Sequence, residues 1–304
     1  MKLTSRTFLP ISIIALLVAL TLLIPRSRFA LLIAIGRNYC PIGSVWSVSK
    51  EQAAMVELRR QLEGTARIVR VEGDYVLWEI AGQRVWMPLG SRVLPGMLAE
   101  QKAALYESAG QAVRPGEVVM DCGANVGLYT LAALERGASL VVAIEPALDN
   151  VECLYRNLAD YVAAGRVVIC PKGVWDKDDV LPLNVQPSNT ASYSVALKYR
   201  GATPGPYVQL TTIDELVRDL KLERVDYIKL DIEGAEREAL AGATGTIRRF
   251  HPRLTISMEH RYDDSKAIPK MVLSLWSGYR MACGRCIEQS AGLRPAVMSF
   301  YTEP

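Results

Sequence analysis

Short apolar runs alternate with helix-patterned stretches through most of the chain after residue 117. The runs have the length of strands, and the stretches between them place apolar residues three or four positions apart, as a helix does. Strands and helices in alternation build a parallel sheet that is covered on both faces. We therefore predict an α/β fold with a doubly wound, Rossmann-like, mostly parallel sheet of seven strands. The predicted strands are 117–121, 140–145, 166–172, 227–231, 254–259, 280–288 and 296–301, and the predicted helices are 126–136, 149–161, 213–220, 235–241 and 265–276.

The chain before this region has two further patterns. Residues 49–63 carry an incomplete apolar stripe and predict an amphipathic helix. Residues 65–89 alternate apolar and polar positions, with glycine breaks, and predict three short antiparallel strands. This small β layer either packs against the core or covers an acceptor pocket as a lid. We assign residues 41–98 to this subdomain and residues 99–304 to the α/β domain.

The strongest anomaly in composition is the apolar segment Phe8–Ile24. All seventeen of its residues are uncharged and twelve are Leu, Ile, Val or Phe, which is the short end of a membrane-spanning helix. Arg26, Arg28 and Arg37 flank a second, shorter apolar run that suits the membrane interface. We predict that residues 1–40 are a membrane anchor, spanning or monotopic, with the α/β domain facing the cytosol, at the inner membrane in a bacterium. A cleaved signal peptide and a buried hydrophobic helix are the alternatives.

Charge and cysteine content narrow the function classes. The net charge is +3, and no basic run or face marks a nucleic-acid binder. The six cysteines are scattered through a long chain without the spacing of a disulfide scaffold, which predicts reduced thiols in a cytosolic compartment. Cys283 and Cys286 form a lone C-x-x-C. We interpret it as a hairpin turn with incidental thiols, because zinc needs two more ligands.

The stretch Val118–Thr130, VVMDCGANVGLYT, is a strand, a glycine turn and the start of a helix. Such a turn aims free backbone N–H groups into a crevice that binds a nucleotide-like ligand. Glu145 ends the next apolar run, where a carboxylate can accept hydrogen bonds from both ribose hydroxyls. Asn125 replaces the middle glycine of G-x-G-x-x-G, which weakens the case for a pyrophosphate and so for NAD. Asp121 suits the ammonium group of S-adenosylmethionine (SAM). An ordinary βαβ turn is the alternative.

Asp226–Leu240, DYIKLDIEGAEREAL, is a strand that ends in an acid and is followed by a helix. Together with DCGANVG, the pair Glu259-His260 and TIDEL at 212–216, it resembles the FkbM family of SAM-dependent methyltransferases. The resemblance covers residues 100–260 and implies a class I Rossmann-like fold that transfers methyl, usually to a hydroxyl oxygen. Tyr106 takes a position near the methionine end of SAM in many such enzymes, although a surface helix is the simpler explanation. The residues predicted to bind SAM are Asp121, Gly123, Ala124, Asn125, Gly127, Glu145, Pro146 and Asp231.

Catalytic residues are expected at the carboxyl ends of the strands, where α/β sheets bind ligands. His260, Asp231 and Glu259 all follow predicted strands. His260 is the predicted base for an alcohol acceptor, and Asp231 orients it, approaches the methionine ammonium or binds the acceptor. Alternatively the three side chains hold a divalent metal, provided that the strand ends between Glu259 and His260. The loop 188–193 faces the acceptor or the cofactor, or is a flexible linker.

These patterns together predict a membrane-anchored SAM-dependent methyltransferase. Anchoring favours a hydroxyl of a lipid, a lipid-linked sugar or another amphiphilic molecule as the acceptor. Membrane lipids are the expected partners, nucleic acid is not, and a homodimer is left open. Two alternatives come from other function classes: an NAD-linked Rossmann oxidoreductase and a non-catalytic SAM-binding membrane scaffold.

Overall fold

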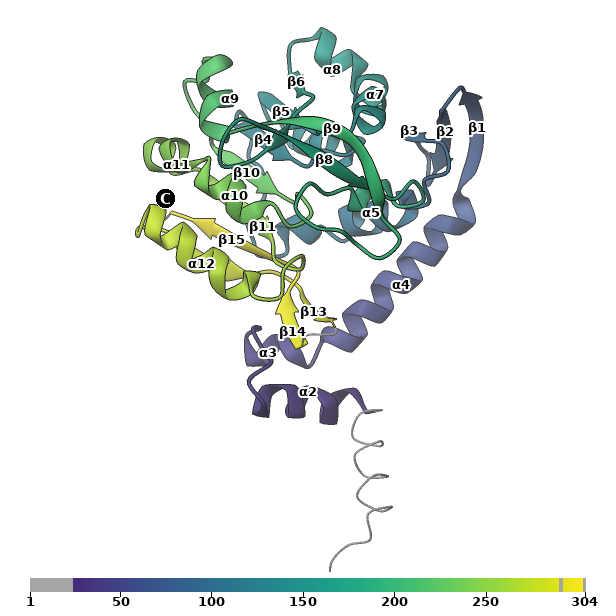
Figure 1. Ribbon diagram of the computed structural model, residues 1–304. Helices are drawn as coiled ribbons and strands as arrows, with labels where there is room; N and C mark the ends of the chain where they lie inside the picture. Colours follow the sequence, from purple (N-terminus) through teal and green to yellow (C-terminus); the bar gives the residue numbers. More distant parts are fainter. Residues whose placement is uncertain (1–23, 290–291, 303–304) are drawn as a thin grey trace, which may run out of the picture.

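The computed structural model describes residues 24–289 and 292–302. The predicted membrane segment Phe8–Ile24 therefore lies outside the described residues, except for its last residue. Among the helices of the described residues, none is both long enough and apolar enough to cross a bilayer. Figure 1 shows a central sheet with helices on both faces, a small β layer at one side and two short helices projecting at the N-terminal end.

Seven strands form the central sheet, as predicted. Their order is β12-β15-β11-β10-β4-β5-β6, and only β15 runs antiparallel to its neighbours. The chain order reverses between β4 and β10, and this switch point is where such sheets bind ligands. The strands are β4 (Val118–Cys122), β5 (Leu140–Ile144), β6 (Val167–Cys170), β10 (Tyr227–Leu230), β11 (Arg253–Ser257), β12 (Arg280–Cys283) and β15 (Val297–Tyr301).

Alternate residues of each strand enter two cores, one on each face of the sheet. Val119 and Val141 belong to the core beside α6, α7 and α8, whereas their neighbours Met120 and Val142 belong to the core beside α9 to α12. Burial on both faces explains why these strands are continuous apolar runs. Among the helices beside this sheet, the sequence missed α11, whose Thr-Gly-Thr start is a poor helix former, and joined α7 and α8 into one helix. The helices are α6 (Leu128–Glu135), α7 (Leu148–Asn157), α8 (Ala159–Ala163), α9 (Ile213–Asp219), α10 (Glu236–Ala241), α11 (Thr244–Phe250) and α12 (Asp264–Leu275).

The β layer before the core has the three predicted antiparallel strands. Its buried side chains, among them Val76 and Met87, pack with two helices that flank it in sequence. The side chain of Asn157 accepts a hydrogen bond from the backbone N–H of Trp86 (2.7 Å) and donates one to its carbonyl (3.0 Å). These contacts pack the three strands on the core, and among the described residues 65–89 none lines the active-site cavity. The elements are α4 (Val48–Thr65), β1 (Arg67–Glu72), β2 (Tyr75–Ile80), β3 (Gln83–Pro88) and α5 (Leu94–Lys102).

A second small sheet covers the carboxyl end of β5. It has the order β7-β9-β8, with β7 (Gly173–Val174), β8 (Asp179–Val185) and β9 (Thr203–Thr211). Leu183, Val208 and Leu210 of this sheet pack against Ala147, which follows β5. The loop between β8 and β9 includes the short 3-10 helix η2 (Thr190–Ser192). The sheet thereby holds this loop against the ligand-binding edge of the main sheet.

At the N-terminal end, α2 (Pro25–Ala34) and α3 (Ile42–Val45) pack on a hairpin of β13 (Cys286–Gln289) and β14 (Gly292–Pro295). Phe29 and Val45 are buried in this contact, and a disulfide joins Cys40 to Cys286 across it. Two predictions are corrected here. The cysteines are not all reduced thiols, and residues 280–288 form two strands in different sheets because the chain turns between them at the C-x-x-C.

Candidate active site

A cavity of about 470 Å³ opens at the carboxyl ends of β4, β5, β10 and β11. Its volume lies in the range of small-molecule sites. The turns after these strands, α5 and the loop after β8 supply the lining. Two of the predicted SAM-binding residues, Asp121 and Gly127, do not line it. The predicted residues that do are Gly123, Ala124, Asn125, Glu145, Pro146, Asp231, Glu259 and His260, together with Ser188, Asn189, Thr190, Ala191 and Tyr193 of the predicted loop.

The turn after β4 requires glycine at two positions. Gly123 has a φ of +79°, and a Cβ there would lie 2.0 Å from the carbonyl oxygen of Asp231. Gly127 has a φ of +95°, and its Cβ would lie 3.1 Å from the side chain of Leu154. Asn125 between them also adopts a left-handed φ of 50°, which Asn tolerates better than most residues. Gly127 therefore shapes the turn from outside the cavity.

Glu145 stands at the end of β5 with only 5% of its surface exposed. Its carboxylate accepts hydrogen bonds from the backbone N–H groups of Asn125 (3.0 Å) and Ala147 (3.0 Å) and from the side-chain amide of Asn150 (3.3 Å). Burial raises the pKa of Glu145 to about 7, and these hydrogen bonds oppose the rise. The carboxylate is thus fixed in the cavity wall where a ribose-binding acid was predicted.

Asp121 is fully buried in β4 and does not reach the cavity. It accepts a hydrogen bond from the hydroxyl of Thr130 (2.7 Å), and its Oδ1 lies 3.2 Å from Nζ of Lys229. Lys229 in turn donates to the carbonyl oxygen of Gly123 (2.8 Å). Burial lowers the pKa of Lys229, but the neighbouring Asp121 and Asp231 raise it by more, so the net shift is upward. The geometry therefore corrects one prediction: Asp121 pairs with Lys229 and does not face a methionine ammonium.

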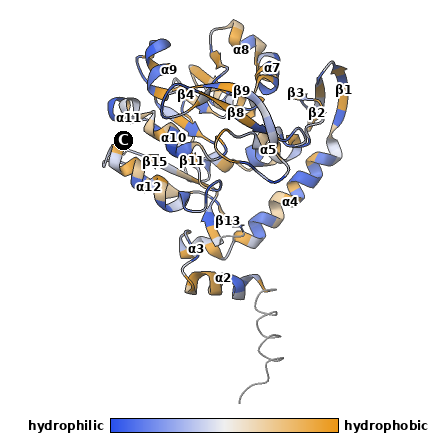
Figure 2. Ribbon diagram, in the orientation of Figure 1, coloured by the Kyte–Doolittle hydropathy of each residue, from blue (hydrophilic) through white to orange (hydrophobic). Residues whose placement is uncertain are grey.

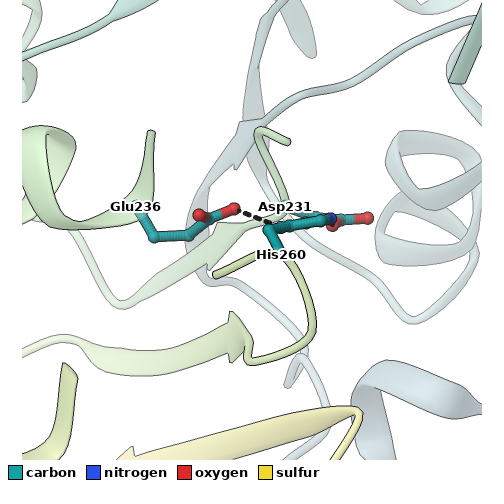
Figure 3. Close-up of side chains that lie close together, drawn as sticks. All are labelled: Asp231, Glu236 and His260. Carbon is teal, nitrogen blue, oxygen red and sulfur yellow. Dashed lines mark hydrogen bonds and ion pairs between the residues drawn. The ribbon is translucent and has the colours of Figure 1, made fainter. Parts of the chain in front are cut away.

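His260 is held from one side by Glu236. β11 ends at Ser257, so Glu259 and His260 lie in the turn that follows, and both line the cavity. Nδ1 of His260 lies 2.9 Å from Oε1 of Glu236, and Figure 3 shows Asp231 on the other side of the imidazole ring. The same glutamate oxygen accepts a hydrogen bond from the backbone N–H of Ile232 (3.0 Å). The sequence suggested that Asp231 orients the imidazole, whereas the structure places Glu236, which is 1% exposed, in that position.

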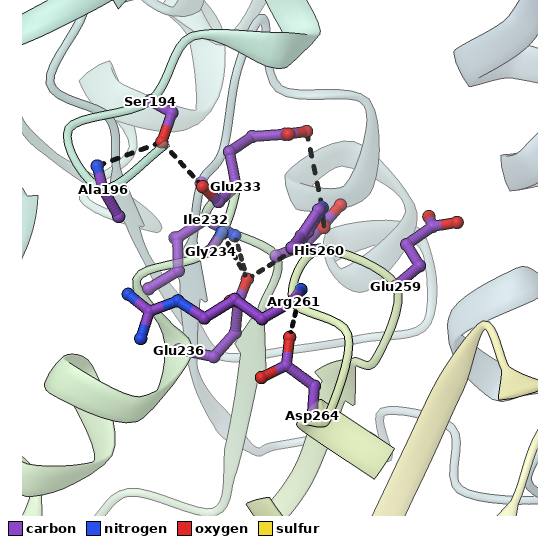
Figure 4. Close-up of polar contacts among 12 residues, drawn as sticks. Ser194, Ala196, Ile232, Glu233, Gly234, Glu236, Glu259, His260, Arg261 and Asp264 are labelled. Carbon is purple, nitrogen blue, oxygen red and sulfur yellow. Dashed lines mark hydrogen bonds and ion pairs between the residues drawn. The ribbon is translucent and has the colours of Figure 1, made fainter. Parts of the chain in front are cut away.

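Nε2 of His260 faces two further acids. Oδ1 of Asp231 and Oε1 of Glu233 each lie 3.6 Å from it, and Figure 4 shows Glu233 and Glu236 on opposite sides of the ring. Burial disfavours the charged imidazolium, but Glu236 and Glu233 outweigh it and hold the pKa of His260 well above its ordinary value. The surrounding acids therefore favour the protonated form of His260.

Asp231 also accepts a hydrogen bond from the hydroxyl of Tyr106, in the short helix η1 (Leu105–Glu107). Burial raises the pKa of Asp231, but Lys229 and His260 more than reverse this, and the net shift is downward. Asp231 thus stays ionised at neutral pH. Tyr106 lines the cavity, so it is not on a surface helix, and its predicted place near the methionine end of SAM stays a prediction.

Two more carboxyl groups line the same end of the cavity. Glu259 accepts a hydrogen bond from the side-chain amide of Gln289 (3.0 Å), and burial raises its pKa to about 7. Glu100 projects from α5, and burial together with repulsion from Asp231 and Glu259 raises its pKa to about 8. Carboxyl groups therefore outnumber cationic side chains around His260. A cationic ligand would reduce the repulsion between these carboxyl groups.

The predicted metal set is assembled only in part. Asp231, Glu236 and His260 each offer one ligand atom, and these atoms lie within 4.8 Å of one another. Glu259, which the prediction included, is not in this group and is bound by Gln289. Because Glu236 already holds Nδ1 of His260 and a backbone N–H, the arrangement fits an orienting pair better than a metal site.

The sequence assigned no site role to Glu236 or Glu100, and it marked Lys229 only as a candidate buried partner for an acid. Glu236 is in the DIEGAE string, but the pattern allowed only a helix-start role, because nothing local shows which distant side chain it meets. Lys229 alternates with the acid Asp231 on one strand, which was a usable signal for a buried ion pair. Glu100 lies on a helix before the core, and no motif marks it.

The model of the methyltransferase FkbM domain matches residues 121–281, more than half of the chain. The chain belongs to the FkbM methyltransferase domain family. The match contains the glycine turn, Glu145, the DIEGAE string and His260, all of which line or shape the cavity.

Individual relatives are more distant. Methyltransferase sdnD of Sordaria araneosa is 29% identical over 153 residues, which are 41% of this chain and 59% of the relative. The 31-O-demethyl-FK506 methyltransferase FkbM of Streptomyces tacrolimicus is 27% identical over 166 residues, 45% of this chain and 63% of the relative. The chain thus spans less than two thirds of either. A solved methyltransferase FkbM from Methylobacillus flagellatus KT is 20% identical, with 83% of this chain and 59% of that chain covered and a TM-score of 0.46.

Proposed function

We propose that this FkbM-family protein is a SAM-dependent O-methyltransferase that acts, from a membrane-anchored position, on a hydroxyl of a lipid, a lipid-linked sugar or another amphiphilic molecule. The family match over residues 121–281 carries the proposal. The cavity supports it, because its lining includes a fixed carboxylate, Glu145, and an imidazole, His260, which Glu236 holds from behind and further acids surround.

The donor set fits SAM. SAM supplies a methyl group already activated on a sulfonium, so the cofactor carries the hard chemistry. Glu145 would accept hydrogen bonds from the ribose hydroxyls, beside the turn that contains Gly123 and Asn125. Glu100 of α5, which also lines the cavity, would face the cationic methionine part.

The chain itself must bind the acceptor hydroxyl, align it and remove its proton. Glu236 fixes the imidazole so that Nε2 of His260 points toward Asp231 and Glu233. We assign the proton-accepting role to His260, acting at pH values where it has lost its second proton. Asp231 then binds the acceptor hydroxyl, and alignment of the two reactants provides much of the acceleration. Glu259, with a pKa of about 7, is the second candidate base.

A divalent metal is the alternative route to the same deprotonation. The carboxylate oxygens near His260 suit Mg²⁺, although the imidazole is already held by Glu236. Activity that survives EDTA treatment assigns the proton transfer to side chains alone. Activity that EDTA abolishes and Mg²⁺ restores supports the metal.

The proposed membrane association is argued from the N-terminal residues 1–40, and its orientation from the supply of SAM. The apolar run Phe8–Ile24 and the nearby arginines support an anchor, and the supply of SAM favours a cytosolic face, at the inner membrane in a bacterium. The disulfide between Cys40 and Cys286 is of a kind that is rare in the cytosol. Thiol alkylation of the denatured protein checks the orientation, because Cys40 and Cys286 that react only after reduction would place the domain on the opposite, oxidising side. Light scattering of the purified protein would show whether it forms a homodimer.

The direct test is incubation of the purified full chain with methyl-labelled SAM and native membrane lipids. We expect label in one extractable hydroxyl-bearing product, identified by mass spectrometry, and an initial labelling rate at least about 10²-fold lower with the His260→Ala variant. SAM binding without a labelled product from any lipid extract would favour the non-catalytic scaffold. Binding of NAD in place of SAM would favour the oxidoreductase.

A further inference from the structure

The segment from residue 24 to residue 46, comprising α2, α3 and the turn between them, exposes an unusual number of large apolar side chains. Ile24, Leu31, Ile35, Ile42 and Trp46 are 51%, 40%, 55%, 62% and 46% exposed. Leu31 and Ile35 are four positions apart and share one face of α2, and Figure 2 shows this helix mostly in the hydrophobic colour. Large apolar side chains exposed together in one short segment are typical of an interaction site.

This segment is rigidly mounted on the catalytic domain. Phe29, opposite the exposed face, is 1% exposed and packs with the hairpin of β13 and β14. Arg28 forms an ion pair of 2.5 Å with Glu288 of β13, and the disulfide joins Cys40 to Cys286. The exposed side chains therefore cannot turn inward without breaking a covalent bond and a buried core.

The same hairpin reaches the active site. Gln289, the last residue of β13, donates to the carboxylate of Glu259 in the cavity wall (3.0 Å). The side chain of Gln52 in α4 also donates to the carbonyl oxygen of Glu288 (3.3 Å). Whatever binds residues 24–46 is thus held at a fixed geometry relative to the acceptor end of the cavity.

The charge of the N-terminal region indicates what binds to residues 24–46. The first acidic residue of the chain is Glu51, whereas the first fifty residues contain six basic ones: Lys2, Arg6, Arg26, Arg28, Arg37 and Lys50. The remainder of the chain is net acidic, since the whole has 35 basic and 32 acidic residues. Two copies of such a surface would repel each other, whereas an anionic surface attracts it.

We propose that residues 24–46 form a platform that docks on an anionic lipid bilayer and so fixes the orientation of the active site at the membrane. The apolar run that precedes Ile24 in the sequence leads directly into this surface. Arg26 and Arg37 lie exposed at the two ends of α2, where they meet anionic headgroups. Trp46 has the amphipathic ring that is enriched at membrane interfaces. This platform deepens the proposed membrane association and rests on it, but it requires nothing of the methyl-transfer chemistry.

The test uses the full chain in vesicles of phosphatidylcholine and phosphatidylglycerol whose acyl chains carry bromine, a contact quencher of tryptophan fluorescence. We expect quenching that Trp46→Phe largely removes, although the chain has five tryptophans. Ile35→Glu should abolish this quenching, because a charge would enter the apolar interface. Arg37→Gln should lower the ratio of docked to undocked platform about fivefold, the effect of one basic residue near an anionic surface.

Ile68→Glu on β1 is the matched control, since Ile68 and Ile35 are both 55% exposed. It should leave the quenching unchanged. Equal quenching in wild type and Trp46→Phe, or equal responses to the two glutamate variants, would overturn the proposal. A dimer in detergent that Ile35→Glu dissociates, with no quenching by lipid, would assign the surface to a second copy. SAM calorimetry on the same variants should be unaffected, which separates failure of the platform from failure of the proposed enzyme.

Discussion

The two ends of the cavity are built in different ways. At the cofactor end, Glu145 receives its hydrogen bonds from Asn125, Ala147 and Asn150, all of them near it in the fold and two of them through the backbone. At the acceptor end, three acids lie around the single imidazole of His260: Asp231, Glu233 and Glu236. The carboxylate of Glu145 is already hydrogen-bonded within the chain. The acids around His260 repel one another, and their protonation would change when ligands bind. Substitutions at the cofactor end should therefore change affinity, and substitutions at the acceptor end should change rate.

The largest effect is expected at the acceptor end. His260→Ala should lower kcat by about 10²- to 10⁴-fold, the usual contribution of a general base, while SAM affinity stays unchanged. His251→Ala is the control, because His251 stacks on Trp276 with ring centroids 4.0 Å apart, at the opposite edge of the sheet. Equal rates for the two variants would remove His260 from the chemistry.

The turn beneath the cofactor end should be the most sensitive to added volume. Gly123→Ala would place a Cβ 2.0 Å from a backbone carbonyl at a φ of +79°, and should cost about 2–5 kcal/mol of folding stability from overpacking plus left-handed strain. Gly116→Ala, at a φ of +82° with no atom within 4 Å of the added Cβ, should show only the strain, about 1–2 kcal/mol. Urea denaturation measures both, and equal losses would mean that the close approach does not exist.

At the cofactor end, Glu145→Ala should weaken SAM binding by about 1.5–3 kcal/mol, the scale of hydrogen bonds to a charged group. The reason is the loss of a carboxylate fixed in the cavity wall. Titration calorimetry gives the difference directly. An unchanged Kd would take Glu145 out of the binding site and erase the contrast between the two ends.

The pH profile of kcat sharpens the assignment of the base. A base acts when deprotonated, so the rate should rise as pH increases through its pKa. Glu236 and Glu233 raise the pKa of His260 well above its ordinary value against the effect of burial, so the rise should be centred on the alkaline side. A rise centred near pH 7 would instead assign the proton transfer to Glu259, whose pKa burial raises to about 7.

The fold was largely predictable because its signals are local. Strands buried on both faces are continuous apolar runs, and Gly123 and Gly127 are required by turn geometry at one place in the chain. Burial of Asp121 was not predictable, because a residue pattern does not show that Lys229 reaches it from a strand more than a hundred residues away.

The acceptor end was predictable only in outline. His260 and Asp231 follow strands that a parallel sheet brings together, so their proximity followed from topology. The partner of the imidazole, Glu236, depends on how the turn after β10 folds, with Glu233 in a left-handed conformation. The disulfide of Cys40 and Cys286 joins segments 246 residues apart, and no spacing rule connects them.

Calorimetric titration of the full chain with SAM, with NAD as the comparison ligand, tests most directly whether the cavity is a methyl-donor site. The account predicts saturable binding of SAM that requires Glu145, and no heat from NAD. Absence of SAM binding by folded protein, or preferential binding of NAD, would contradict it.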